Sequence, residues 1–220
     1  MSGAIAWRDS ASDMPREGAV VVVSLLPGIA EPAPTSRDLD EAPPREPRRA
    51  RFFARRTFTR RIVAARLKVA ADHVTIAHAP DGSPRVVVPE CALRLSISGR
   101  DDFCAVGVAP CAIGVDLEPL GAVVEPAWNV LHARERAVLD ALSGAARHEM
   151  FLRLWTAKEA YVKALGQGLS REPAQIEIVA IGADAFTVRE ARLRAGAWRS
   201  VDLDGRRFIA ACALLDCPLS

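Results

Sequence analysis

The helix and strand patterns follow one another in the same order in the two halves of the sequence. Each half has a segment with the three- and four-residue spacing of an amphipathic helix, followed by short apolar runs that suit strands. Each half also carries one Asp-Gly pair, at 81–82 and 204–205, which is typical of a tight hairpin turn. The chain is therefore expected to be α+β, either as two similar lobes or as one general α+β domain with common turns.

The longest expected helix spans about 48–69. Ala50, Ala54, Phe58 and Ile62 form an apolar stripe along it, and seven arginines surround that stripe. Further helices are expected around 130–142 and at 150–165, and strands at 19–26, 74–77, 85–88, 93–98, 103–108, 113–118, 175–181, 185–189, 198–203 and 207–214.

The N-terminal part offers fewer patterns. Residues 1–18 are polar and expected to be loose, and 27–47 contains six prolines, which predicts an extended loop without a helix of its own.

Composition limits the classes of protein to consider. Of the 220 residues, 50% are hydrophobic and 25% are charged, which excludes global disorder. No apolar run reaches the roughly 18 residues of a membrane span, so we expect a cytoplasmic protein that enters no membrane. The net charge of +2 gives no reason to expect nucleic-acid binding. The five cysteines form no C-x-x-C pair, which predicts reduced thiols rather than a zinc site or a disulfide framework.

The first candidate site is the acidic pair of the expected strand at 113–118. Side chains alternate along a strand, so Val115 and Leu117 face the core while Asp116 and Glu118 share the other face, about 7 Å apart. Two charges at that distance repel by roughly 2 kcal/mol at an effective dielectric constant of 20. Water relieves this repulsion on an exposed edge strand, which is the simpler interpretation, and a divalent cation relieves it at a buried site.

The second candidate lies on the expected helix at 150–165. Leu152, Trp155, Glu159 and Val162 share one narrow stripe, and a carboxylate among apolar side chains is costly unless it is paired or binds a metal. Glu159 also stands four residues before Lys163, so a surface ion pair is an equal alternative.

Taken together, the two candidates indicate a metal site. Asp116, Glu118 and Glu159 could meet around one Mg²⁺, which binds few protein oxygens and leaves positions for phosphates. Lys158 and Lys163, two of the three lysines in the chain, would then supply positive charge near those phosphates. The combination predicts metal-assisted chemistry on a diphosphate compound.

At these residues the sequence resembles the Sfp-type 4′-phosphopantetheinyl transferases. The resemblance rests on the segment Gly114-Val115-Asp116-Leu117-Glu118, followed after roughly 40 residues by the W-x-x-K-E motif that begins at Trp155. The arginine-rich segment from Arg51 resembles the basic helix of the family. The similarity covers roughly residues 48–170.

The resemblance implies two pseudo-symmetric lobes, 1–112 and 113–220, with the active site at their interface. It implies that phosphopantetheine is transferred from coenzyme A to a serine of an acidic acyl or peptidyl carrier protein, by a monomer that uses Mg²⁺ or, in its place, Mn²⁺. The metal ligands would be Asp116, Glu118 and Glu159. Glu159, Asp116 and Lys163 would be catalytic, and the residues expected to bind coenzyme A are Arg51, Arg56, Arg60, Arg85, Ser96, Lys158 and Lys163.

Two positions depart from the family pattern. Ile97 stands where the family has the histidine of its S-H-S motif, and Ser83 replaces the lysine of G-K-P. An aliphatic side chain cannot donate a hydrogen bond to a phosphate, so we expect weaker binding of coenzyme A. Two alternatives therefore stay open, namely a non-catalytic module that binds coenzyme A or a carrier protein, and another Mg²⁺-dependent phosphotransferase or hydrolase.

Overall fold

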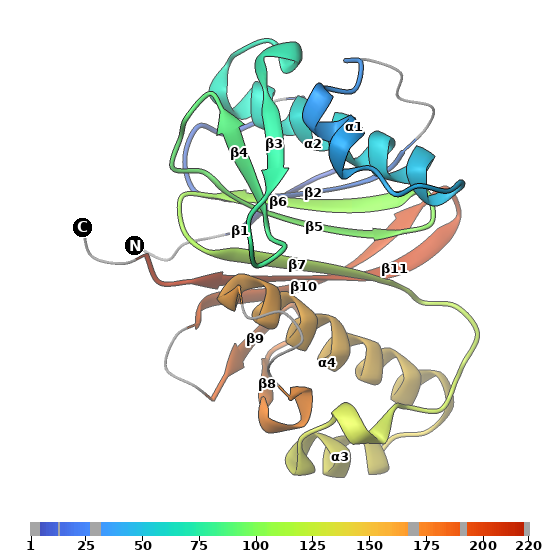
Figure 1. Ribbon diagram of the computed structural model, residues 1–220. Helices are drawn as coiled ribbons and strands as arrows, with labels where there is room; N and C mark the ends of the chain where they lie inside the picture. The colour runs from blue at the N-terminus through green and yellow to red at the C-terminus, as the bar shows by residue number, and fades with distance from the viewer. Residues whose placement is uncertain (1–4, 13, 27–31, 167–171, 190–192, 218–220) are drawn as a thin grey trace.

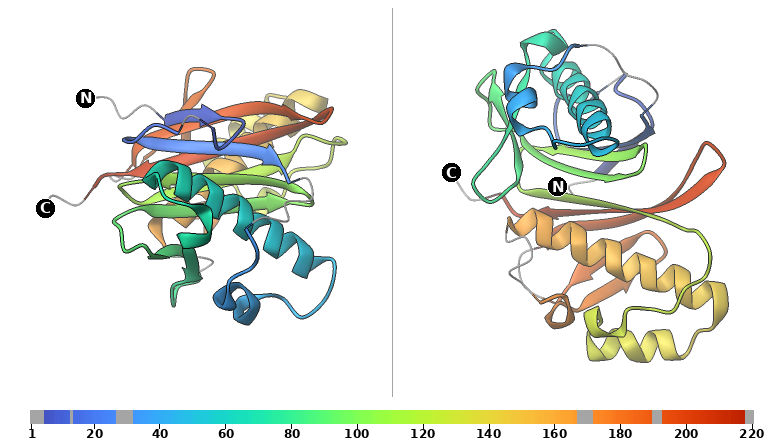
Figure 2. Two further views of the ribbon diagram at one scale, coloured as in Figure 1. Left: turned by 90° about the horizontal axis from the view of Figure 1, so that it is seen from above. Right: turned by 45° about the vertical axis from the view of Figure 1, so that its right-hand side comes forward.

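Two β-sheets lie face to face in the middle of the molecule, and one long helix covers the outer face of each sheet (Figure 1). The computed structural model describes residues 5–12, 14–26, 32–166, 172–189 and 193–217. The four layers, helix, sheet, sheet and helix, are also distinct when the molecule is turned (Figure 2). The α+β class expected from the sequence is confirmed.

The first sheet has six strands in the order β1-β2-β6-β5-β4-β3. β1 pairs with β2 in parallel, and the other neighbours pair antiparallel. Their bounds are β1 Ile5–Arg8, β2 Ala19–Leu25, β3 Thr75–His78, β4 Pro84–Val88, β5 Arg94–Arg100 and β6 Phe103–Ala109.

The second sheet has five antiparallel strands in the order β7-β11-β10-β9-β8. Their bounds are β7 Ile113–Pro119, β8 Ile178–Ile181, β9 Ala185–Val188, β10 Leu193–Leu203 and β11 Arg206–Leu215. The described α-helices are α1 Ser36–Glu41, α2 Arg48–Leu67, α3 Ala133–Asp140 and α4 Gly144–Leu165.

Three apolar cores hold the layers together. Phe58 of α2 packs with one face of the first sheet, Phe208 of β11 lies in the core shared by the two sheets, and Tyr161 of α4 packs with the outer face of the second sheet. β2 and β11 read as continuous apolar runs because each contributes side chains to two cores, as strands buried on both faces do. The expected boundary between 112 and 113 falls between β6 and β7, and the division into two domains stays a prediction.

The N-terminal part differs from the sequence expectation. α1 lies inside the proline-rich segment predicted to hold no helix, because Thr35 and Asp38 form a capping box that satisfies the first backbone groups of the helix. β1 lies in the segment expected to be loose, where it gains a strand partner in β2. α4 also begins at Gly144, earlier than the expected start at 150.

The cysteine prediction is wrong for one pair. Cys111 and Cys217 form a disulfide, and their Cα atoms lie 4.9 Å apart. The two ends meet because Leu215 N donates a hydrogen bond to Ala112 O at 3.0 Å, which brings the end of β11 beside the turn before β7. Cys91, Cys104 and Cys212 are free, as expected. No helix among the described residues is long and apolar enough to span a membrane.

Candidate active site

β7 carries the acidic pair on the side of the sheet that faces α4. Val115 and Leu117 are fully buried between the sheets, so the alternation predicted for this strand is confirmed. Asp116 is 2% exposed, and its Oδ1 accepts hydrogen bonds from Lys163 Nζ at 2.7 Å and from Ser98 Oγ at 2.8 Å. Asp116 Oδ2 is buried and has no hydrogen-bond partner among the described residues.

A close approach of α4 to β7 brings the helix residues to Asp116. A Cβ atom at Gly114 would overlap Ala160 O of the helix backbone, so only glycine allows this spacing. Lys163 Nζ also donates to Val115 O at 3.1 Å. The helix ends directly after this point, because Gly166 adopts a left-handed conformation with a φ of 66°.

Glu159 lies half-buried on the same side of α4. Burial raises the pKa of its carboxyl above the usual value, and the nearby charge of Asp116 raises it further, while Lys163 acts in the opposite direction. Among the described ion pairs, Lys163 is matched with Asp116 rather than with Glu159. The carboxylates of Asp116 and Glu159 therefore lie near the ammonium group of Lys163, and Lys163 pairs with Asp116 instead of forming the expected ion pair with Glu159 along the helix.

Glu118 is near enough to Glu159 for its charge to raise the pKa of that carboxyl, and it has its own basic partner in Arg100. Its Oε2 accepts a hydrogen bond from Arg100 Nε at 2.8 Å, its Oε1 also contacts Arg100, and Trp155 Nε1 lies 3.3 Å from Oε1. The side chain of Arg100 comes from β5, so this ion pair joins the two sheets.

Two observations bear on whether a divalent cation suits this place. Asp116 Oδ2 is a buried oxygen without a partner among the described residues, and the pKa of Glu159 is raised by burial and by the negative charges of Asp116 and Glu118. Both fit the preference of Mg²⁺ for carboxylate oxygens. Among the described residues, however, no three histidine, cysteine, aspartate or glutamate side chains form a ready-made metal centre. The structure thus brings the charges of Asp116, Glu118 and Glu159 near one another, with Lys163 paired to Asp116 and Arg100 paired to Glu118.

Lys158 lies in a different place from the one expected. Its side chain is fully buried, forms an ion pair with Glu135 at 2.7 Å and donates to Pro173 O and Ile176 O. Burial lowers the pKa of Lys158, and Glu135 opposes that effect. Lys158 and Lys163 are five residues apart, about 140° around the helix, so they project from different faces. This placement does not agree with a contact between Lys158 and a diphosphate.

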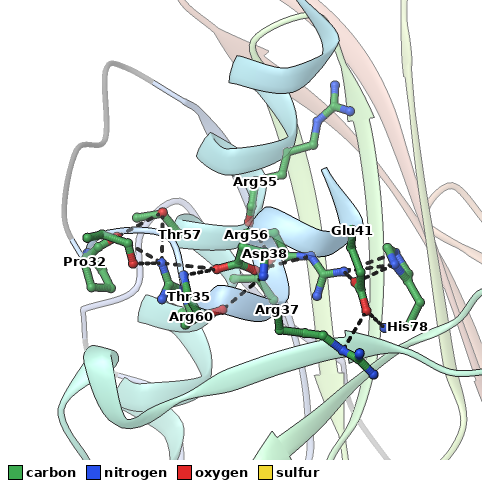
Figure 3. A network of polar contacts seen from close by, with 12 residues as sticks. Pro32, Thr35, Arg37, Asp38, Glu41, Arg55, Arg56, Thr57, Arg60 and His78 are labelled. Carbon is green, nitrogen blue, oxygen red and sulfur yellow. Dashed lines mark hydrogen bonds and ion pairs between the residues drawn. The ribbon is translucent and has the colours of Figure 1, made fainter. Parts of the chain in front are cut away.

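Two arginines of the basic helix α2 are buried and lie against acidic side chains of α1 (Figure 3). Arg56 is 3% exposed and forms an ion pair with Glu41 at 2.5 Å, and Arg60 is 1% exposed and lies 3.7 Å from Asp38. Burial lowers the pKa of both guanidinium groups, and the acidic side chains of α1 oppose that effect. These two arginines hold α1 against α2 instead of facing a ligand. Of the three arginines expected to bind coenzyme A on α2, only Arg51 is partly exposed, and it pairs with Asp101 and Asp102.

A cleft lies between the β3–β4 turn, β5 and the end of α4. It comprises two adjoining cavities of about 530 and 240 Å³ that share Lys163, Ser83 and Asp81 in their walls. Arg85 lines the larger cavity, and Ile97 lines the smaller one. The cleft thus reaches Lys163, which touches Asp116.

Ser96 belongs to the wall of the smaller cavity but is only 4% exposed. Its Oγ accepts a hydrogen bond from Val115 N at 3.0 Å, so this hydroxyl joins β5 to β7. Sequence reasoning did not find Arg94, which lines the larger cavity. Its position two residues before Ser96 places it on the same face of β5, and that alternation could have indicated it.

Comparisons with known proteins show which family this chain resembles. Residues 112–213 match the family model described as the 4′-phosphopantetheinyl transferase superfamily. The 4′-phosphopantetheinyl transferase AcpT of Escherichia coli K12 is 32% identical over 61% of this chain and 67% of its own length. HetI of Nostoc is 33% identical over 56% of this chain and 54% of its own, and the putative transferase slr0495 of Synechocystis is 30% identical over 54% and 51%.

The chain spans about half the length of the last two relatives. A solved structure, the holo-[acyl-carrier-protein] synthase of Thermotoga maritima, aligns over 49% of this chain and 64% of that chain at 21% identity, with a TM-score of 0.38 that is too low to argue from. The matched segment contains Asp116, Glu118, Glu159 and Lys163. On the family match and the similarity to AcpT, this chain belongs to the 4′-phosphopantetheinyl transferase superfamily.

Proposed function

We propose that the protein transfers the 4′-phosphopantetheine group of coenzyme A to a serine hydroxyl of an acyl or peptidyl carrier protein. The observation that carries this proposal is the position of Lys163, which lines both cavities of the cleft and lies 2.7 Å from Asp116. A cation at this place can face the diphosphate of a nucleotide in the cleft while the neighbouring carboxylates face the reacting centre.

Three side chains have roles in the proposed reaction. The Glu159 carboxylate accepts the proton of the carrier serine as the serine oxygen attacks the phosphorus that bears the pantetheine. The bond from that phosphorus to the oxygen of the second phosphate breaks, and adenosine 3′,5′-bisphosphate leaves. Lys163 Nζ offsets the negative charge that grows on this leaving group. Asp116 holds Lys163 in place through their hydrogen bond.

A divalent cation, expected to be Mg²⁺ or Mn²⁺, would be held by Asp116 and Glu159. When bound, it would neutralise charge on the diphosphate. Glu118 is the third expected ligand, and it would have to leave Arg100 to take part. Lys158 is left out of the proposed site because of its burial.

The test is to incubate the full chain with Mg²⁺, coenzyme A and an apo carrier protein, and to weigh the carrier by intact mass spectrometry. A gain of one phosphopantetheine group is expected. Asp116→Asn should abolish the gain, whereas Arg199→Gln, an exposed change on β10, should keep it. Thermal melts of both variants would show that they are folded.

Other outcomes would refute the proposal and point to the two alternatives. Breakdown of coenzyme A without modification of the carrier would indicate a different phosphotransferase or hydrolase. Binding of the carrier or of coenzyme A without any mass change would indicate a binding module. The cytoplasmic location, the monomeric state and the absence of nucleic-acid partners stay predictions.

A further inference from the structure

Two arginines stand directly opposite each other in the first sheet. β4 and β5 are registered at a single pair, Arg85 with Arg94. Side chains of directly opposed residues in an antiparallel pair lie on the same face, and like charges in that position destabilise the pair. Nothing in the apolar packing of these strands requires positive charge at both positions, because both side chains are exposed.

Neither arginine has an acidic partner in the part of the chain that the structure describes. Among the described residues, no ion pair or side-chain hydrogen bond involves Arg85 or Arg94, whereas Arg51, Arg56, Arg60 and Arg100 all have acidic partners. The one acidic residue in the wall beside them, Asp81, accepts hydrogen bonds from Ser83 N at 2.9 Å and Ser83 Oγ at 2.6 Å within its own turn.

Both arginines line the larger cavity of the cleft, of about 530 Å³, together with Lys163. In the described wall of the smaller cavity, Lys163 is the only cationic side chain. Coenzyme A carries a diphosphate and a separate 3′-phosphate, so Lys163 alone cannot neutralise it. The opposed arginines are the remaining cationic side chains in the described wall of the cleft, and a phosphate monoester with two negative charges matches two guanidinium groups.

We propose that Arg85 and Arg94 together bind the 3′-phosphate of coenzyme A and make the protein select coenzyme A over its 3′-dephospho form. This inference rests on the proposed function for the identity of the ligand. It assigns Arg94 a role that the sequence did not indicate, and it places the 3′-phosphate in the larger cavity, which Lys163 also lines.

The inference is tested by nucleotide binding, which needs neither a carrier protein nor turnover. Calorimetry would compare adenosine 3′,5′-bisphosphate with adenosine 5′-monophosphate on the wild type, Arg85→Gln, Arg94→Gln, the double variant and the control Arg199→Gln. Because a hydrogen bond to a charged group contributes roughly 1.5–3 kcal/mol, each single change should weaken bisphosphate binding about tenfold or more. The double change should weaken it about a hundredfold, while binding of the monophosphate changes by less than about twofold.

Several results would overturn the inference. Equal losses for both nucleotides would show a general attraction for anions, and unchanged binding of the bisphosphate would show no role for the pair. A rise only in the KM for the carrier protein would identify the two arginines as a docking surface. Arginine-dependent binding of the bisphosphate by a protein that never modifies a carrier would refute the proposed activity and support the phosphate site.

Discussion

Glu159 lies half-buried beside a second carboxylate, and both features favour its protonated form. A raised pKa means that the carboxyl keeps its proton to a higher pH than a free glutamate does. Without a bound cation, the carboxyl of Glu159 should therefore titrate at a higher pH than a free glutamate does. An NMR titration of the metal-free protein, with Glu159→Gln to assign the signal, would measure this pKa. Addition of Mg²⁺ should lower it, because a cation favours the charged carboxylate. A pKa at or below the value for a free glutamate in the metal-free protein would contradict the expectation.

The same shift has a consequence for stability. A carboxyl whose pKa is raised by folding destabilises the folded state once pH exceeds its unfolded value, because the charged form is then disfavoured in the protein. Glu159→Gln should therefore raise the melting temperature at pH 7 without added metal, by about 1–3 °C. Scanning calorimetry at pH 4 and pH 7 would check this, since the difference should shrink at the lower pH. A lower melting temperature for the variant at pH 7 would contradict the expectation.

Lys158 and Glu135 form a buried ion pair, and removal of one partner leaves an uncompensated charge. Lys158→Met should lower the free energy of unfolding by about 3–5 kcal/mol. Adding Glu135→Gln should recover part of the loss, because the orphaned charge disappears. Urea denaturation of the two variants would measure both values. A folded Lys158→Met variant of normal stability that bound coenzyme A weakly would instead support the role expected from the motif.

The sequence singles out the acidic residues and Lys163 as candidate site residues. It does not indicate which side chains form hydrogen bonds and ion pairs with them. Strand alternation placed Asp116 and Glu118 on one face, and helical spacing placed Glu159 on a partly apolar stripe. Neither pattern indicates that β5 lies beside β7, and β5 is the strand that supplies Arg100 and Ser98. A shared motif likewise groups Lys158 with Lys163, although the helix turns them to different faces.

At the scale of elements, α1 is fixed by charge more than by apolar contact (Figure 3). Burial opposes the ionisation of Glu41, but the hydrogen bond from His78 N and the charges of Arg56, His78 and Arg37 outweigh it and lower the pKa. A lowered pKa stabilises the folded state above the unfolded pKa, and this contribution is lost as pH falls through the folded pKa.

Glu41→Gln should accordingly lower the melting temperature by about 2–4 °C at pH 7. The difference from the wild type should vanish well below pH 4.5, where both side chains are neutral. Melting curves across this pH range would test it, with Asp140→Asn on α3 as a matched exposed control. A difference that stayed constant with pH would show that the ion pair is not its cause.

Most elements could be predicted because their apolar patterns are strong, such as the three- and four-residue spacing in α2 and the continuous apolar run in β11. α1 was missed because the prolines on either side of it masked a capping box. β1 was missed because it is short and only half-buried, so it depends on its partner β2. Local sequence does not contain such long-range pairing.

At the scale of the whole molecule, the disulfide joins the turn before β7 to the end of the chain after β11. It closes a loop with a sequence separation of 106 residues, and a cross-link of that length restricts the unfolded chain strongly. In oxidising buffer, Cys217→Ser should lower the free energy of unfolding by about 2–4 kcal/mol. In reducing buffer, the variant and the wild type should be equally stable.

Urea denaturation in the two buffers would measure the effect, with Cys91→Ser as a control at a free cysteine. Titration of thiols in the unfolded, unreduced wild type should find the three free cysteines only. Five reactive thiols would contradict the bond.

Ser96 of β5 also contacts the backbone at the edge of the second sheet. β7 is the outermost strand of its sheet, and such a strand ordinarily offers its unpaired backbone groups to other chains as a template for aggregation. Here the Ser96 hydroxyl accepts the Val115 amide hydrogen bond, as a neighbouring strand would otherwise do. The hydrogen bond from Val115 N to Ser96 Oγ thus helps to shape the cleft and also satisfies a backbone amide at the edge of the sheet. Loss of the Ser96 hydroxyl should therefore disturb the cleft and favour self-association through β7 at the same time.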